Sequence, residues 1–396
     1  MKIIGRFVLI LLLLVLLAAA AVVIWGPALV ERSRNVVTAP DGTWPVSPEA
    51  EELHKHLIIG DLHADSLLWD RDLLDRASYG HVDVPRLIAG NVAVQVFATV
   101  TKSPRGQNYD HNSASAPDNI TPLVIGQLRP PQTWFSLRAR ALDQAARLNA
   151  YAAAAPDELR VIRSRADLQA LLAARAQGAK TVGAILASEG GHPLEGQIEN
   201  LRLMYDAGFR IIGVTHFFDN ELGGSLHGEG GAGAGAGLTP FGREVISEMA
   251  DRDMIVDLAH ASPQVVRDVL AMPHVTPILS HTGIHSQCGS HRNIDDALLQ
   301  GIAQKGGIVG IGYWADVNCG RRPADIAHSI AAAIRLLGED HVALGSDFDG
   351  SVDAPFDAAH LDVLTQALLD EGLSDNQIAK VMGGNMMAFL IGHLPQ

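Results

Sequence analysis

A short apolar segment followed by a helical segment recurs along most of this chain. Eight such apolar segments occur between residues 57 and 346. They are Leu57–Leu62, Val92–Val100, Thr181–Ala187, Phe209–Thr215, Met254–Leu258, Thr276–Ser280, Gly307–Tyr313 and Val342–Ser346. Near-continuous apolar strands are typical of parallel sheets that are covered on both faces. The alternation therefore predicts an α/β fold built as a closed (β/α)8 barrel, with an open doubly wound sheet as the alternative.

Helices are expected between several of these strands. The segments with helical character are Pro131–Ala154, Arg165–Gln177, Pro240–Arg252 and Ile326–Leu337. Thr239 ahead of Pro240 has the pattern of an N-cap followed by proline at the first helical position. Barrels of this kind reach the length of residues 51–396 as single domains, so we predict one barrel domain over that range.

The N-terminus carries a long apolar run. Lys2 and Arg6 precede 19 apolar residues, Phe7 to Trp25, which as a helix would span roughly 28 Å, about one bilayer core. A cleavable signal has an apolar stretch of only about 7–15 residues before its cleavage site. We predict that residues 1–30 are an uncleaved membrane anchor, with a cleaved export signal as the alternative, and that residues 31–50 are a linker. The body would then face the periplasm from a bacterial-type inner membrane, or be exported.

The composition narrows the classes of function. The formal net charge is −14, and so acidic a chain is poorly suited to gripping a phosphate backbone, so no nucleic-acid partner is expected. Two cysteines exclude a cysteine-clustered metal site, whereas the chain has 17 histidines. The reactive side chains of interest are therefore imidazoles and carboxylates.

Such side chains follow six of the eight predicted strands. In a (β/α)8 barrel the catalytic groups lie at the carboxyl ends of the strands, so these side chains should converge at one mouth. They are His63, Asp65, Glu189, His216, His260, His281 and Asp347.

Histidines and carboxylates without thiolates suit Zn²⁺ or a similar divalent ion. His63 and Asp65 are two residues apart on an extended segment, so both point to one side. Glu189 has two carboxylate oxygens and could bridge two ions. The residues thus allow a two-metal hydrolytic centre in which a bridging hydroxide is the nucleophile.

Seven motifs resemble those of the membrane dipeptidase (renal dipeptidase) family, a branch of the amidohydrolase superfamily. The resemblance runs from about Glu51 to Ile391. The motifs are Asp61-Leu-His-Ala-Asp65, Ser188-Glu-Gly-Gly-His192, Val214-Thr-His216, Asp257-Leu-Ala-His260, Ser280-His-Thr-Gly283, His291-Arg-Asn293 and Gly345-Ser-Asp-Phe-Asp-Gly350.

The resemblance implies a zinc-dependent dipeptidase that also accepts a D-residue at the carboxyl side of its dipeptide substrate. By motif match, one zinc would be held by His63, Asp65 and Glu189, and a second by Glu189, His260 and His281. His216 and Arg292 would contact the substrate, and His216 would help a zinc ion to polarise the carbonyl oxygen. Asp347 would serve the proton transfers. A disulfide between Cys288 and Cys319 is also suggested, with two unlinked thiols as the alternative.

Other readings of the same residues remain open. The first alternative is an enzyme with the same barrel and metal ions that opens a β-lactam or a lactone, or that removes an amino group. Deaminases of this superfamily usually have a His-x-His first motif and one metal ion, so Asp65 and Glu189 as ligands argue against deamination. Another is a non-catalytic, membrane-tethered binding protein, which should have lost a ligand or Asp347. A homodimer is left open. The glycine-rich stretch Gly228–Gly237 lacks a phosphate-loop ending and is interpreted as a flexible active-site loop.

Overall fold

The computed structural model describes residues 2–39, 43–229 and 236–396, and within these residues eight parallel strands form the centre of the fold. Their order around the sheet is β7-β6-β5-β3-β2-β10-β9-β8. They are β2 (Ile59–Ala64), β3 (Val92–Thr99), β5 (Val182–Ser188), β6 (Phe209–Gly213), β7 (Ile255–Asp257), β8 (Leu279–Thr282), β9 (Val309–Ile311) and β10 (Val342–Leu344). Each falls on one of the predicted apolar segments.

The two end strands of this sheet meet. A parallel bridge joins Asp257 to Ile278, and the Leu258 amide donates to the Ile278 carbonyl at 2.8 Å. The sheet is therefore a nearly closed barrel, which confirms the predicted (β/α)8 architecture. A short strand, β4 (Leu159–Val161), pairs with the start of β5 outside this order.

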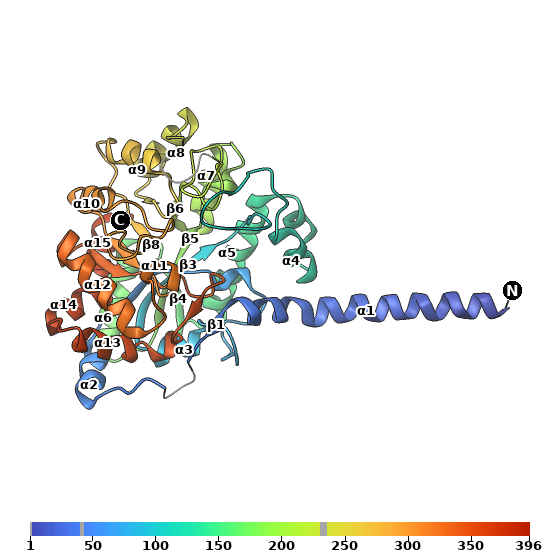
Figure 1. The fold of residues 1–396 in the computed structure, drawn as a ribbon, viewed down its shortest axis with the longest axis horizontal. Coiled ribbons are helices and arrows are strands. Elements are labelled where there is room, and N and C mark those ends of the chain that lie inside the picture. The colour runs from blue at the N-terminus through green and yellow to red at the C-terminus, as the bar shows by residue number, and fades with distance from the viewer. Residues whose placement is uncertain (1, 40–42, 230–235) are drawn as a thin grey trace.

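Helices surround the barrel (Figure 1). They are α2 (Pro48–His56), α3 (Val84–Ala89), α4 (Ile120–Gly126), α5 (Leu137–Ala154), α6 (Arg165–Ala176), α7 (Glu199–Ala207), α8 (Pro240–Asp251), α9 (Pro263–Leu270), α10 (Asp296–Gln304), α11 (Ala315–Asn318), α12 (Pro323–Leu337), α13 (Asp362–Asp370), α14 (Asp375–Ala379) and α15 (Asn385–His393). Short 3-10 turns are η1 (Ser66–Leu68), η2 (Pro131–Trp134), η3 (His192–Leu194) and η4 (Ala358–His360), and η5 (Lys380–Gly384) is a π-helical turn. All residues of β2, β3 and β5 are buried, because side chains on one face fill the barrel and those on the other pack under the helices.

Capping residues set where two of the predicted helices begin. Thr239 accepts a hydrogen bond from the Gly242 amide at 2.9 Å, as expected for the start of α8. The predicted helix over residues 131–154 is divided instead, because the Ser136 hydroxyl caps the Ala139 amide at 3.1 Å. The continuous helix therefore begins at Leu137, and η2 precedes it as a separate turn.

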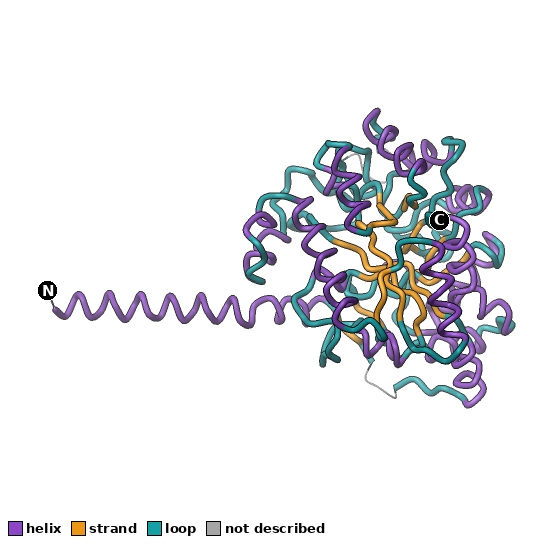
Figure 2. Tube along the Cα trace, turned by 180° about the vertical axis from the view of Figure 1, so that it is seen from behind, coloured by secondary structure: helices purple, strands orange, loops and turns teal. Residues whose placement is uncertain are grey.

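Helix α1 (Lys2–Arg34) projects from the body, as Figures 1 and 2 show. It contains one candidate membrane span, over Arg6–Arg34, with a mean hydropathy of 3.5 in its 18-residue window. Its last turns belong to the body, since Pro27 and Glu31 are buried.

The chain after α1 also packs on the barrel. Strand β1 (Val36–Val37) pairs in parallel with β11 (Asp353–Ala354). Residues 31–39 of the predicted linker are thus docked on the body. The last residues of the predicted linker, from Pro48 on, form the start of α2. Residues 40–42 lie outside the described part of the chain. The boundaries at residues 30 and 50 stay a prediction.

Candidate metal centre

The predicted metal-binding side chains come together at the carboxyl end of the barrel. His63 lies in β2 and Asp65 follows it, Glu189 follows β5, and His260 follows β7. His281 lies inside β8 rather than after it, because β8 continues to Thr282 and does not end at the predicted residue 280. All five side chains are buried.

The Glu189 carboxylate occupies the middle of this group. Its Oε1 atom lies 3.1 Å from His260 Nε2, 3.4 Å from His281 Nε2 and 3.5 Å from His63 Nε2. The same His63 Nε2 atom also lies 3.3 Å from Asp65 Oδ1. One carboxylate therefore contacts imidazoles from three different strands or strand ends.

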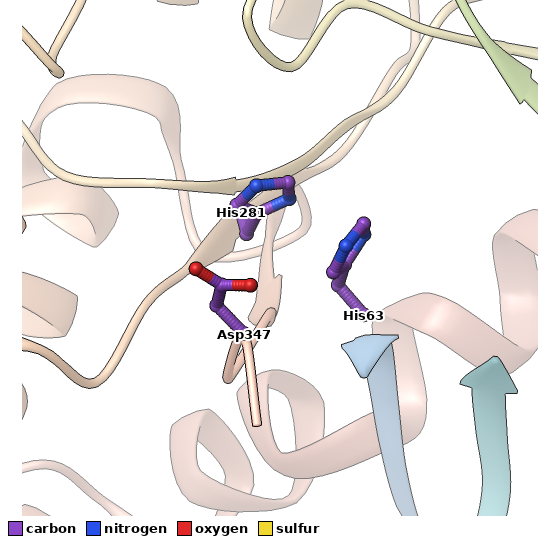
Figure 3. Close-up of side chains that lie close together, drawn as sticks. All are labelled: His63, His281 and Asp347. Atoms are coloured by element: carbon purple, nitrogen blue, oxygen red, sulfur yellow. The ribbon is translucent and has the colours of Figure 1, made fainter. Parts of the chain in front are cut away.

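The donor set fits divalent metal ions. Three groups have ligand atoms within 4.8 Å of one another: His63, Asp65 and Glu189; His63, His281 and Asp347; and Glu189, His216 and His260. Figure 3 shows the imidazoles of His63 and His281 beside the Asp347 carboxylate. His63 Nε2 and Asp65 Oδ1 are buried and, beyond the ion-pair contacts of His63 Nε2 with Asp65 and Glu189, neither atom has a hydrogen-bond partner. Such buried polar atoms are costly unless a partner compensates them, and a cation between them would do so.

Ser280 fixes the orientation of two of the histidines. Its hydroxyl donates to Asp257 Oδ2 at 2.6 Å and lies 2.8 Å from His281 Nδ1 and 3.3 Å from His63 Nδ1. A hydroxyl has one donor and two acceptor lone pairs, so both Nδ1 atoms can carry hydrogen and donate to it. The Nε2 lone pairs of His63 and His281 are then free for metal. The sequence analysis missed this role of Ser280 and Asp257, although both lie in the motifs that contain His281 and His260.

The protonation equilibria of the metal-free site reflect burial and crowded carboxylates. Burial, and next the charge of Asp65, raise the pKa of Asp347 to about 8 and raise the pKa of Glu189 well above its usual value. For His63, burial lowers the pKa, but the carboxylates led by Asp65 outweigh it and raise the pKa to about 10. Burial holds the pKa values of His260 and His281 well below the usual histidine value. Without a cation, the carboxyl groups of Asp347 and Glu189 therefore tend to hold protons.

Three more predicted site residues line the same cavity, namely His216, Arg292 and Asp347. His216 lies close enough to the metal site to be a ligand itself, since its Nε2 is 3.3 Å from Glu189 Oε2. The other ring nitrogen, Nδ1, is 3.4 Å from the Lys102 carbonyl oxygen. Arg292 is buried and donates from Nη2 to the His281 carbonyl at 2.8 Å. The roles of these residues toward substrate stay predictions.

Two of the site residues have strained backbones. His260 and Asp347 have φ angles of 61° and 58°, in the left-handed region that residues other than glycine rarely adopt. The His260 carbonyl is held by the Leu226 amide at 2.7 Å and by the Thr215 hydroxyl at 3.0 Å. Such strain persists where surrounding contacts fix the backbone, and it concentrates at functional sites.

Part of the cavity is lined by loop residues that do not directly follow a predicted strand. Tyr109, in the long loop after β3, lines it, and the Trp314 indole donates to the Tyr109 hydroxyl at 3.0 Å. The sequence analysis missed Tyr109 because nothing in its local pattern distinguishes it. Of the glycine-rich stretch, residues 230–235 lie outside the described chain, so its interpretation as an active-site loop stays a prediction.

A disulfide joins Cys288 to Cys319. It ties the loop after β8, which contains Arg292, to the end of α11. The disulfide suggested by the family resemblance is therefore confirmed, and the alternative of two free thiols is wrong.

Comparison with known proteins identifies a family that the sequence of this chain matches. A family model described as membrane dipeptidase (peptidase family M19) matches residues 47–390. The chain is similar to the dipeptidase aclJ of Aspergillus oryzae (strain ATCC 42149 / RIB 40), with 28% identity over 359 residues, 86% of this chain and 79% of that protein.

Two solved structures share the fold. A metallo peptidase from Rhodobacter sphaeroides, liganded with a phosphinate mimic of the dipeptide L-Ala-D-Ala, has a TM-score of 0.71 and 23% identity, covering 85% of this chain and 99% of that one. The probable dipeptidase PvdM from Pseudomonas aeruginosa has a TM-score of 0.72 and 17% identity, covering 87% and 97%. With the family model spanning most of the sequence, the chain belongs to the membrane dipeptidase family, peptidase family M19.

Proposed function

We propose that this chain is a metal-dependent dipeptidase that binds two zinc ions bridged by Glu189. The observation that carries the proposal is the position of the Glu189 carboxylate, whose Oε1 lies within 3.5 Å of Nε2 atoms of His63, His260 and His281. Family membership supports the reaction, because the family and the relative aclJ are both described as dipeptidases.

His63, Asp65 and Glu189 would hold one ion, and Glu189, His260 and His281 the other. Imidazole and carboxylate ligands without thiolates suit zinc or a similar divalent ion, and we propose zinc. When bound, the ions would lower the pKa of water and polarise the peptide carbonyl. Ser280 would keep His63 and His281 in the tautomer that presents Nε2 to metal, at the distances given above.

The chain's own residues would then position the substrate and move the proton. Asp347 is a buried carboxylate beside His63 and His281, and it would accept a proton from the attacking water and deliver it to the departing amine. The other nearby carboxylates, Asp65 and Glu189, are committed to metal in this scheme. The Arg292 guanidinium would pair with a substrate carboxylate or a developing oxyanion.

His216 would contact the substrate beside Glu189 and help to polarise its carbonyl oxygen. Its Nδ1 faces the Lys102 carbonyl at 3.4 Å, so Nδ1–H is the tautomer that this contact favours. Neutral His216 then presents the lone pair of Nε2 to the cavity. Burial also holds the pKa of His216 well below the usual histidine value, which disfavours the imidazolium form. To polarise a substrate oxygen by donation, His216 would therefore take the other neutral tautomer, with hydrogen on Nε2.

The proposed substrates are dipeptides, including those with a D-residue at the carboxyl end. The similar Rhodobacter sphaeroides protein binds a phosphinate mimic of L-Ala-D-Ala, which supports this choice. We also propose that residues 1–30 anchor the protein in a membrane, with the barrel on the periplasmic side. The apolar run Phe7–Trp25 and its exposure along α1 support the anchor.

The test uses the full chain purified in detergent. Metal content is measured by elemental analysis, and hydrolysis is followed for L-Ala-D-Ala, L-Ala-L-Ala, a β-lactam and a lactone. We expect two zinc ions per chain, hydrolysis of both dipeptides, loss of rate with a chelator and recovery with zinc. Glu189→Gln should lower metal content and rate together, because a neutral amide is a poor bridge. A fully loaded protein that opened the lactone or β-lactam but left dipeptides intact would contradict the proposal.

A further inference from the structure

Exposed apolar side chains of the body gather in one short stretch. Outside α1, the described residues expose five large apolar side chains, and three of them are Ile125 (41% exposed), Leu128 (70%) and Phe135 (87%). The other two, Ile58 and Leu203, belong to separate parts of the chain. We call Ile125, Leu128 and Phe135 the α4 apolar patch.

The patch lies on one continuous structural unit. After α4, the Leu128 amide donates to the Ile125 carbonyl and the Arg129 amide to the Val124 carbonyl, both at 3.0 Å. The Trp134 indole donates back to the Arg129 carbonyl at 3.0 Å and its ring lies beside that of Phe135. Leu128 has a φ of 53°, so a leucine is held in a glycine-like conformation with its side chain in the open. Among the described residues, little packs against that side chain, which is 70% exposed.

This unit lies against the anchor helix. A Cβ atom placed on Gly126 would be 3.6 Å from Pro27 Cγ, and Figures 1 and 2 show α4 beside α1 where that helix leaves the body. Pro27 follows the end of the apolar run at Trp25 by two residues, which is about 3 Å of helix rise. The patch therefore lies near the level at which α1 would leave a bilayer.

We propose that the α4 apolar patch is a membrane-contact surface that enters the interfacial region of the same phospholipid bilayer that holds α1. The inference rests on the membrane attachment proposed above. Continuity with α1 points to lipid as the occupant, because exposed Trp25 and Leu29 on α1 adjoin the level of the patch. Apolar and aromatic side chains around a spanning helix are favoured at this depth, where their burial removes apolar surface from water.

The same helix reaches from the bilayer to the catalytic cavity. Ile120, the first residue of α4, lines the cavity together with Asp65 and Asp347. Ile125, at the other end of α4, belongs to the patch. Docking of the patch would thus bring this side of the cavity close to the lipid headgroups.

The native cysteines permit a direct test, because both are in the disulfide and none is free in the described chain. Phe135→Cys and Leu128→Cys are made in the full chain, labelled with an environment-sensitive fluorophore and reconstituted into phosphatidylcholine vesicles. Leu203→Cys is the matched control, since Leu203 is 42% exposed on α7, away from α1. We expect blue-shifted emission and quenching by nitroxide-labelled lipid at positions 135 and 128, and aqueous emission at position 203.

The outcomes separate the inference from the proposals beneath it. Vesicle flotation reports attachment, and dipeptide hydrolysis in detergent reports the proposed reaction. If the chain floats but the probe at position 135 has the same emission and quenching as the probe at position 203, this inference alone is overturned. Equal quenching at positions 128, 135 and 203 would also overturn this inference alone. A chain that does not float overturns the attachment and this inference together. A second variant, Leu128→Asp with Phe135→Asp, should reduce quenching of a probe at Ile125→Cys, whereas Leu203→Asp should not.

Discussion

Arg71 joins Glu31, near the end of α1, to Asp349, two residues beyond Asp347. Its guanidinium pairs with both carboxylates, and all three side chains are buried. Asp349 in turn accepts hydrogen bonds from the Ser66 hydroxyl and the His81 amide, each at 2.6 Å. The end of α1 is thus part of the structure that supports the loops after β2 and β10.

Removal of residues 1–26 should leave a stable and active enzyme, whereas removal of residues 1–35 should destabilise it. The longer deletion removes Glu31 from Arg71 and removes Asn35, whose side-chain oxygen accepts from the Ser351 amide at 2.9 Å. Removal of one partner from a buried ion pair costs about 3–5 kcal/mol when it leaves the other charge alone. Here Arg71 keeps Asp349 as a partner and burial raises the pKa of Glu31 to about 7, so we expect a smaller loss. Thermal unfolding and the rate of dipeptide hydrolysis are compared for the two truncations. Equal melting temperatures would show that the pair does not contribute to stability.

Ser280→Ala should weaken zinc binding about 10- to 100-fold, the usual effect of losing a hydrogen-bond partner of a metal ligand. The reason is that Nδ1 of both His281 and His63 would lose the acceptor that selects their tautomer. Zinc affinity is measured by competition with a chromophoric chelator. Ser329→Ala is the control, since this serine is equally buried, in α12, and its hydroxyl lacks a hydrogen-bond partner. Equal affinities for the two variants would contradict the assignment.

Asp347→Asn should lower kcat by about 10²–10⁴-fold, the range that general acid–base catalysis contributes. Metal content and KM should change little, because Asp347 is not one of the proposed zinc ligands and an amide has nearly the same shape as a carboxyl group. Steady-state kinetics and elemental analysis on the same preparation decide the matter. Loss of zinc would make Asp347 a ligand instead, as its position near His63 and His281 also allows, and a near-normal kcat would assign the proton transfer elsewhere.

Zinc affinity should rise with pH up to about pH 10, where the raised pKa of the proposed ligand His63 lies. In the metal-free protein, burial together with Asp65 also raises the pKa of Glu189, so both of these proposed ligands hold protons at lower pH. A ligand must release its proton to bind metal, so each protonated group weakens binding below its pKa. Calorimetric titration in buffers of different ionisation enthalpy measures the protons released. An affinity independent of pH, with no proton release, would contradict these protonation states.

Local patterns were sufficient for the barrel and for the polar side chains that gather at its carboxyl end. Apolar strands and the polar residues that end them are local signals, so His63, Glu189 and His260 could be found without a structure. The contacts that could not be predicted join residues that are far apart in the sequence. Ser280 and His63 are 217 positions apart, and Arg71 and Asp349 are 278 positions apart. A docked segment and a mobile linker have similar compositions, so the buried position of Glu31 could not be predicted.

The docked segment between α1 and the barrel changes how the enzyme would explore its surroundings. A free linker of about 20 residues would let a domain wander roughly 25 Å from its point of attachment. Here Pro27 and Glu31 are buried in the body, and β1 is paired with β11. The barrel would therefore move with its anchor as one rigid unit, at constant height and tilt above the lipid. Encounters would follow the lateral diffusion of the whole molecule, and the enzyme would sample a thin layer of solution along the surface instead of the full depth of its compartment.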